Sequence, residues 1–315
     1  MTNEVAIGLD YSHNNKLIIE NNAFTDFIQF FFDSDFKLGK IEAGLTYDKL
    51  KKYDLFIIGV PHLGPNLDSD EIADLVKYVE EGGSLLIIND GGGDYENKNN
   101  LSELTQYFGI KFNSDILYDN KDFIKESSHP IIKDFRSHFI TRDITQFIYS
   151  NGCTLKEDKS IENDKIDINI IAYSSKDTSW HTYFNGNAWQ EESEQHLPIL
   201  GAIHYHLGKV FVIGTLSIFS SLSKSYGIKS TENFKLIANV ISWLLNKAGT
   251  EEEKSLKPIF TTVALEQDLY YWIKEILDKG KWKSLDELIN FALNVTKIRL
   301  KEAEKEEEKP QDDKD

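Results

Sequence analysis

Three short polar segments of this sequence carry the residue types that could do chemistry. They are residues 10–14, 61–65 and 89–94, and each follows a short apolar run. The candidate residues are Asp10, Ser12, His13, His62, Asp90, Gly91 and Asp94. Two histidines and several carboxylates can bind a metal, or act as acid and base on a small polar substrate. Alternatively, Asp10 and Ser12 bond backbone amides and the glycines let a turn close. We treat the set as a candidate ligand-binding cleft, assign no catalytic residue, and expect no metal and no cofactor.

Residues 91–93 are three consecutive glycines, which suggests a phosphate cradle. A Walker motif needs a lysine and then a serine or threonine directly after its glycines. Here Asp94, Tyr95 and Glu96 follow, and the two carboxylates would repel a phosphate. We therefore do not predict a nucleotide site.

Two other groups have a chemical interpretation and a structural one. His204 and His206 should share one face of a strand, where Glu194 and His196 could help them bind zinc. We favour the interpretation that these histidines lie on the surface. Likewise, two tryptophans of the polar middle region could stack on a sugar ring, but we favour a loop that they anchor. These tryptophans are Trp180 and Trp189.

The candidate residues would be positioned by alternating strands and helices. Strands are predicted at 5–9, 36–41, 54–60 and 84–88, with helices at 23–33 and from Asp68 or Ser69 to the glycines 82–83. This alternation predicts an α/β fold with a doubly wound, mostly parallel, Rossmann- or flavodoxin-like sheet. In such sheets the loops after the carboxyl ends of the strands converge on a cleft.

The rest of the chain is less regular. A helix is predicted at 100–108, weak strands near 110–118 and 144–149, and an exposed loop at 151–166. Strands at 168–173, 198–205 and 209–214 follow, the last two as a hairpin, and a helix at 231–247 closes the first domain. We expect a linker at 248–257, a small strand-helix-helix module at 258–300, and a disordered acidic tail at 301–315.

Composition limits the function classes. The formal net charge of −17 disfavours binding to nucleic acid and to anionic membranes. No run approaches the roughly 18 to 20 apolar residues that cross a bilayer, and the first residues do not form a signal peptide. A single cysteine, Cys153, expected in a loop and chemically unimportant, makes no internal disulfide. We therefore expect a cytoplasmic protein with no membrane partner.

Residues 1–247 resemble the glutamine-amidotransferase-like superfamily, and within it the non-catalytic branch of intraflagellar-transport GIFT domains. The resemblance is carried by segments 9–13, 50–61, 79–88, 208–214 and 239–244, in this order. It implies that catalytic members carry a cysteine on the turn after the strand 84–88. This chain has Asn89, Asp90 and Gly91 there, so the resemblance implies that thiol chemistry is absent.

Residues 258–300 resemble the ribbon-helix-helix superfamily. The match runs through Val263-Ala264-Leu265, the turn 279–284 and the helical segment 286–293. The resemblance implies a homodimer that pairs strands across a two-fold axis. The outward strand positions that DNA-binding members use are uncharged here (Phe260, Thr262 and Ala264), so we do not expect DNA as a partner.

Together these observations predict a non-catalytic binding or assembly protein that is dimerised by its C-terminal module and docks protein partners. One alternative is a hydrolase of a small polar or sugar-like substrate that uses Asp10, His13 and Asp90. The other is a ligand-responsive DNA-binding regulator.

Overall fold

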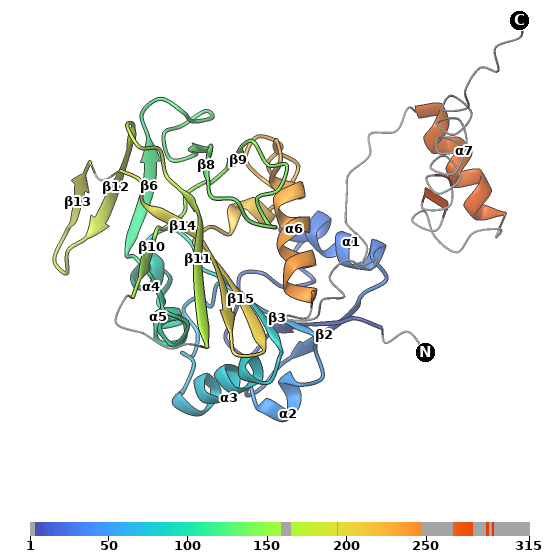
Figure 1. Cartoon of the computed structure of the whole chain (residues 1–315), viewed down its shortest axis with the longest axis horizontal. Coiled ribbons are helices and arrows are strands. Elements are labelled where there is room, and N and C mark those ends of the chain that lie inside the picture. The colour runs from blue at the N-terminus through green and yellow to red at the C-terminus, as the bar shows by residue number, and fades with distance from the viewer. Residues whose placement is uncertain are drawn as a thin grey trace, which may run out of the picture. The chain divides into compact units, whose positions relative to one another are not determined.

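A computed structural model of the chain describes residues 4–158, 165–193, 195–246, 267–279, 288, 289 and 292. The chain forms two compact units, Met1–Thr261 and Thr262–Asp315. The first unit contains the sheets and most of the described helices (Figure 1).

An eight-stranded mixed sheet forms the centre of the first unit. Its strands are β1 (Ala6–Asp10), β2 (Lys37–Ile41), β3 (Leu55–Gly59), β4 (Ser84–Ile88), β8 (Asp134–Phe135), β11 (Ile166–Tyr173), β14 (Pro198–Tyr205) and β15 (Gly208–Ile213). They lie in the order β2-β1-β3-β4-β15-β14-β11-β8. The pairs from β2 to β15 are parallel, and those from β15 to β8 are antiparallel. The predicted mostly parallel sheet and the β14–β15 hairpin are therefore confirmed.

Helices cover both faces of the sheet, as a doubly wound fold requires. They are η1 (Asn22–Phe24), α1 (Thr25–Asp33), α2 (Tyr47–Leu50), α3 (Ser69–Glu80), α4 (Gly93–Asn97), α5 (Leu101–Thr105), η2 (Gln106–Phe108), η3 (Ser217–Phe219) and α6 (Asn233–Leu245). Alternate residues of β3 enter two separate cores. Leu55 and Ile57 pack in the core that contains α1 and α6, which we call the α6 face. Phe56 and Ile58 pack in the core that contains α3 and α5, which we call the α3 face. This burial on both sides explains the continuous apolar run of β3.

Shorter strands extend the domain beside the central sheet. They are β5 (Ile110–Phe112), β6 (Asp115–Asp119), β7 (Ile131–Ile132), β9 (Phe147–Ile148), β10 (Leu155–Glu157), β12 (Ser179–Phe184) and β13 (Trp189–Glu192). β13, β12 and β6 form an antiparallel sheet that projects at one side of the domain (Figure 1). β5 pairs with β10 in a separate two-stranded sheet. The strands β12 and β13 were not predicted, because apolar and polar residues do not alternate regularly in the sequence of this segment.

The prediction of an exposed loop at 151–166 is wrong for the first half of this segment. Leu155–Glu157 is the strand β10, and Cys153 and Thr154 are fully buried. The backbone N–H of Cys153 donates to the carbonyl of Gly214 at 2.9 Å, which ties this segment to the end of β15. The prediction failed because this segment is mostly polar, so its sequence does not indicate burial. The strand is buried because other parts of the fold pack around it. Residues 159–164 lie outside the described part of the chain.

The described part of the second unit is mainly the helix α7 (Gln267–Asp278), which confirms the helix expected at that place. Ile273 is buried, whereas Leu269, Tyr271 and Trp272 are exposed. The expected linker at 248–257, the strand of the ribbon-helix-helix-like module and the tail at 301–315 lie outside the described residues, as does most of the second expected helix.

Candidate functional site

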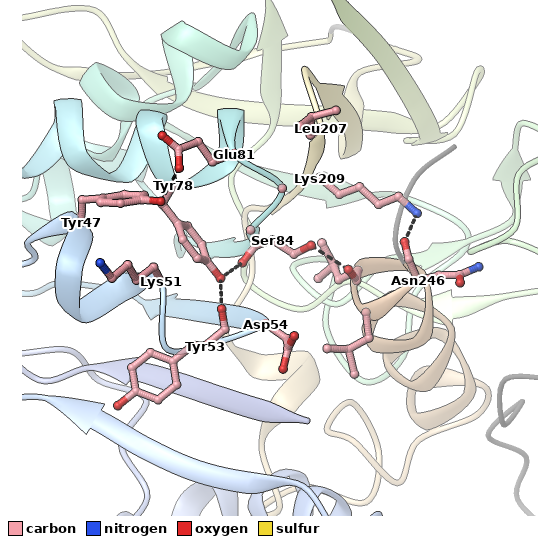
Figure 2. Close-up of a pocket in the computed structure, with 14 residues that line it drawn as sticks. Tyr47, Lys51, Tyr53, Asp54, Tyr78, Glu81, Ser84, Leu207, Lys209 and Asn246 are labelled. Carbon is pink, nitrogen blue, oxygen red and sulfur yellow. Dashed lines mark hydrogen bonds between the residues drawn. The ribbon is translucent and has the colours of Figure 1, made fainter. Parts of the chain in front are cut away.

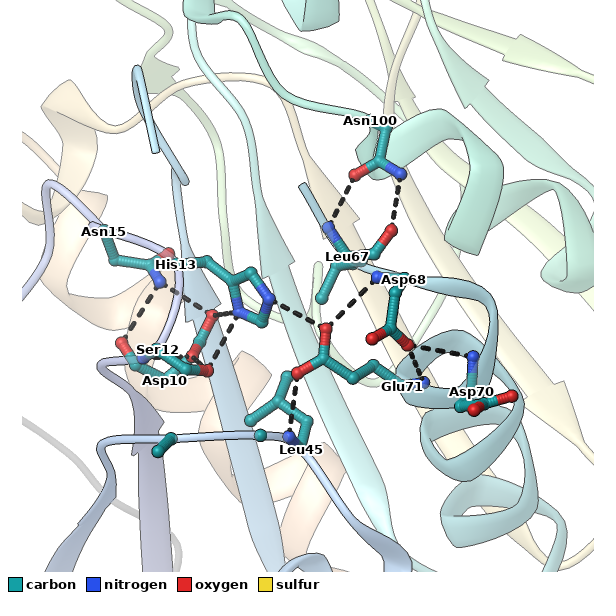
Figure 3. A network of polar contacts seen from close by, with 12 residues as sticks. Asp10, Ser12, His13, Asn15, Leu45, Leu67, Asp68, Asp70, Glu71 and Asn100 are labelled. Atoms are coloured by element: carbon teal, nitrogen blue, oxygen red, sulfur yellow. Dashed lines mark hydrogen bonds and ion pairs between the residues drawn. The ribbon is translucent and has the colours of Figure 1, made fainter. Parts of the chain in front are cut away.

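Asp10 is the last residue of β1, and both oxygens of its buried carboxylate are hydrogen-bonded to residues of the loop that follows (Figure 3). Oδ1 accepts from the backbone N–H of Ser12 at 2.9 Å and from its hydroxyl at 2.7 Å. Oδ2 accepts from the side-chain amide of Asn15 at 2.8 Å and contacts Nδ1 of His13 at 2.9 Å. A carboxylate with four such contacts holds the loop after β1 in one conformation.

His13 bridges two acidic side chains. Its Nδ1 faces Asp10, and its Nε2 lies 3.0 Å from Oε2 of Glu71. Burial by itself lowers the pKa of the His13 ring, but the carboxylates of Asp10 and Glu71 outweigh this effect, and the net pKa is raised. The ring is therefore favoured as an imidazolium that donates from both nitrogens.

Glu71 has this position because it belongs to the first turn of α3. Asp68 caps the helix by accepting from the backbone N–H of Asp70 and Glu71, and the Glu71 side chain accepts from the backbone N–H of Asp68 at 3.1 Å. This is the reciprocal capping box that an acidic N-cap followed by glutamate three residues later produces. Glu71 Oε1 also accepts from the backbone N–H of Leu45 at 3.0 Å (Figure 3). One side chain thus joins α3, the loop before α2 and the loop after β1.

The turn after β4 forms a second polar group. Lys16 donates to Oδ1 of Asn97 at 2.8 Å and pairs with Asp90 at 3.4 Å. Asp94 accepts hydrogen bonds from the Asn89 amide and from the backbone N–H of Ser102, both at 2.8 Å. The second of these bonds joins Asp94 to the first turn of α5. Burial raises the pKa of both carboxyl groups, Asp90 and Asp94, against the opposing effect of the hydrogen bonds that they accept.

The glycine of this turn is required by packing. A Cβ atom on Gly91 would lie 2.5 Å from the carbonyl oxygen of Asn151, and Gly92 and Gly93 have φ angles of 80° and 55°. Any larger residue at 91 would clash with backbone. The glycines therefore shape the turn and form no open cradle.

The seven candidate residues come to the same edge of the sheet but do not form one cluster. Asp10, Ser12 and His13 form one group, and Asp90, Gly91 and Asp94 belong to the other. His62 lies after β3 and joins neither. Its backbone N–H donates to the carbonyl of Asn14 at 3.2 Å, and its buried Nδ1 has no hydrogen-bond partner among the residues described.

A small cavity lies at the opposite edge, where β3, β4 and β15 begin (Figure 2). Its volume is about 230 Å³. The Ser84 hydroxyl on its wall donates to the carbonyl of Leu244 at 2.6 Å, and the Tyr78 hydroxyl donates to the carbonyls of Tyr53 and Ser84. The buried ammonium of Lys209 donates to the carbonyls of Trp243 and Asn246 at the end of α6. The bonds of Ser84 and Lys209 hold α6 against the sheet.

A larger cleft of about 650 Å³ lies between β5, β10, β12 and the beginning of β14. Its polar centre is a buried pair, in which Nδ1 of His181 lies 2.7 Å from Oδ2 of Asp115. Asp115 also accepts from the backbone N–H and the hydroxyl of Thr154, at 2.7 and 2.6 Å. Sequence reasoning missed this pair, because its members stand 66 residues apart and His181 lies on the unpredicted strand β12.

The histidines near the end of β14 do not share a face, and the expectation that they do is wrong. The His204 ring packs against Trp243 of α6, with centroids 5.3 Å apart. His206 follows the strand with a φ of 52°, and its Nε2 lies 3.7 Å from Glu80 of α3. The two rings thus lie on the α6 and α3 faces, because the chain turns before His206. Among the described residues, no group of three histidine, cysteine or acidic side chains could hold a metal.

Burial raises the pKa of the Cys153 thiol well above its ordinary value. A thiol is nucleophilic as its thiolate, so this position does not favour thiol chemistry. Within the described ranges, no helix is both long and apolar enough to cross a membrane.

Comparison with known protein families matches residues 9–173 to the IFT52 GIFT domain. Among solved structures, the mmIFT52 N-terminal domain is similar with a TM-score of 0.61 and 22% identity, over 78% of this chain and 99% of that one. A ThuA-like protein from Bacteroides uniformis ATCC 8492 gives a TM-score of 0.46 and 14% identity, over 76% and 91% of the two chains. The cytoplasmic protein STM1381 from Salmonella typhimurium LT2 gives 0.47 and 12%, over 76% and 98%. No curated protein matches.

The likeness to the mmIFT52 domain supports the fold, and the family match covers more than half of the 315 residues. The chain belongs to the family of IFT52 GIFT domains.

Proposed function

We propose that this protein is a non-catalytic binding or assembly protein. In this proposal its α/β domain is a degenerate amidotransferase-like domain that docks protein partners, and its C-terminal module makes a homodimer. One observation carries the proposal. The acidic side chains and the His13 ring at the carboxyl edge of the sheet are already bonded to other groups of the same chain.

The turn after β4 supports the loss of amidotransferase chemistry. The superfamily resemblance places a nucleophilic cysteine there, and this chain has Asn89 and Asp90. The Asn89 side chain is fully buried and accepts from the backbone N–H of Asp90 at 3.0 Å and from the amides of Asn97 and Asn99 at 3.3 Å. The place of a reactive group is thus used for structural hydrogen bonds.

The hydrolase alternative would use Asp10, His13 and Asp90. A general base needs a nitrogen lone pair that can reach substrate. Both nitrogens of His13 contact carboxylates, and the ring is buried, so it offers no such lone pair. The DNA-binding alternative gains no supporting observation, because the strand that would read DNA lies outside the described residues and the chain carries a net charge of −17.

The helix α7 supports the assembly half of the proposal. Leu269, Tyr271 and Trp272 are 43%, 59% and 54% exposed, which is unusual for three large apolar side chains within one turn of each other. A second copy of the module or a partner protein would remove this surface from water. We also propose a cytoplasmic location, which agrees with a free and buried thiol at Cys153.

Thermal shift assays test whether the carboxyl edge of the sheet is structural. Divalent metals, nucleotides and sugars should leave the melting temperature of the full chain unchanged, because the carboxylates and the His13 ring there already have partners in the same chain. Asp90→Ala should lower the unfolding free energy by about 1 to 2 kcal/mol through the lost contacts to Lys16 and the backbone N–H of Leu216.

The matched control is Asp70→Ala, which removes an exposed carboxylate from the first turn of α3. A ligand that raises the melting temperature of the wild type and of Asp70→Ala, but not of Asp90→Ala, would show a binding site at the edge and contradict the proposal.

A further inference from the structure

The cleft between β5, β10, β12 and β14 has walls of three kinds. Phe112, Leu155, Leu197 and Pro198 give it apolar surface, and Tyr183 adds an aromatic ring next to His181. Its polar lining includes Asp115, Glu157, Glu192, His181 and Lys156. Its volume of about 650 Å³ falls in the range of small-ligand sites, which is about 300 to 1,000 Å³.

The buried centre of the cleft is rigid. Asp115 is fully buried and Thr154 holds it with two hydrogen bonds, so it fixes the orientation of the His181 ring. Such preorganisation is what a binding site needs, since little side-chain entropy is lost when a ligand enters. The carbonyl of Ser114 accepts from the backbone N–H of Phe184 at 2.8 Å, which holds the end of β12 beside β6.

The charges of the lining favour a cation. The lining has three carboxylates, Asp115, Glu157 and Glu192, and one ammonium, that of the exposed Lys156. The His181 ring lies between Asp115, at 2.7 Å, and Glu192, at 4.0 Å, so the carboxylates outnumber the cationic groups in either protonation state of the ring. Half of the Glu192 side chain is exposed, so this carboxylate lies at the mouth of the cleft. The field of a chain with a net charge of −17 adds to the local attraction.

We propose that this cleft binds a guanidinium or ammonium group carried on an apolar stem. The head would pair with Glu157 and Glu192 and lie near the ring of Tyr183, whose centroid is 5.5 Å from that of His181, so that a cation–π contact adds to the ion pairs. The stem would cover Leu155 and Leu197. An arginine or lysine side chain of a protein partner has this chemistry, and so does a free aliphatic amine. The inference does not depend on the assembly role proposed above.

Methyl NMR titrations of the full-length protein test the proposal with three probes. Acetyl-arginine amide should shift the methyl signals of Leu155 and Leu197, whereas the uncharged isostere acetyl-citrulline amide should bind at least about fivefold more weakly, as expected for two partly exposed ion pairs. Butylguanidine is the free cation, and it has the same single charge as acetyl-arginine amide. Tighter binding of acetyl-arginine amide assigns the site to a protein side chain, and tighter binding of butylguanidine assigns it to a small free cation. Either order supports the cationic ligand.

Glutamine substitutions test the contribution of the two carboxylates, because they remove the charge and keep the size of the side chain. Glu157→Gln with Glu192→Gln should weaken binding of acetyl-arginine amide about fivefold. Glu191→Gln is the matched control, because it lies on the same exposed strand but on the face opposite Glu192, and it should leave binding unchanged. Unchanged methyl signals in the core at Ile57 and Leu86 show that each variant is folded. No shift with any cation, equal binding of the citrulline probe, or equal weakening by Glu191→Gln overturns the proposal.

Discussion

His13 lies between Asp10 and Glu71, and this makes stability depend on the protonation of one ring. The pKa of His13 is raised in the folded protein above its ordinary value of 6.5. The stabilisation by the charged ring is therefore fully present below about pH 6.5, and it is lost as the pH rises through the folded value.

The variant His13→Gln tests this at the level of one residue. It should lower the unfolding free energy by about 2 kcal/mol near pH 5.5, because hydrogen bonds between charged groups are lost. The deficit should shrink above the pKa of the folded ring. Urea unfolding at a series of pH values measures it. His62→Gln is the control, because His62 makes no ion pair among the residues described. A deficit that grows with pH would contradict the assignment.

The carboxyl-edge residues show what a sequence can predict about a site. The strand-then-loop pattern correctly predicted that Asp10, His13 and Asp90 come to the same edge of one sheet. It did not predict Glu71 as the second partner of His13, since Glu71 is 58 residues away and its position follows from the capping of α3. Whether the edge binds a ligand remains a prediction.

At the scale of elements, α6 is held to the sheet by a buried lysine. Lys209 of β15 is 3% exposed, and its ammonium donates to two carbonyls at the carboxyl end of the helix. Its Nζ also lies 5.1 Å from the centroid of the Trp243 ring. A cation at this end compensates the negative pole of the helix dipole.

Lys209→Met should therefore destabilise the domain by about 2 to 3 kcal/mol, because it leaves these carbonyls without their charged donor although the apolar stem is kept. Lys37→Met on the edge strand β2 is the control, since Lys37 is exposed and its replacement should change stability by less than about 0.5 kcal/mol. Equal denaturant midpoints for the two variants would show that Lys209 does not fasten the helix.

The elements with strong hydrophobic periodicity or continuous apolar runs were predictable. The three-stranded sheet of β13, β12 and β6 was not. β3, β4, α3 and α6 bury apolar stripes that the sequence displays directly. β12 and β13 mix aromatic and polar residues without a regular alternation, and every residue of β13 is exposed. β12 pairs with β6, which is about sixty residues earlier, and a local pattern carries no information about such a distant partner.

At the scale of the whole molecule, the central claim is that two chains assemble through the C-terminal module. A segment of about forty residues buries little apolar surface when it folds alone, so a partner is expected. The exposed Leu269, Tyr271 and Trp272 of α7 agree with this expectation.

Light scattering coupled to size-exclusion chromatography measures the claim directly. The full chain should have twice the mass of one chain, and a protein truncated at Thr250 should be a folded monomer, because the first compact unit retains its sheet and both cores. A full-length monomer, or a truncated protein that remains dimeric, would contradict the account.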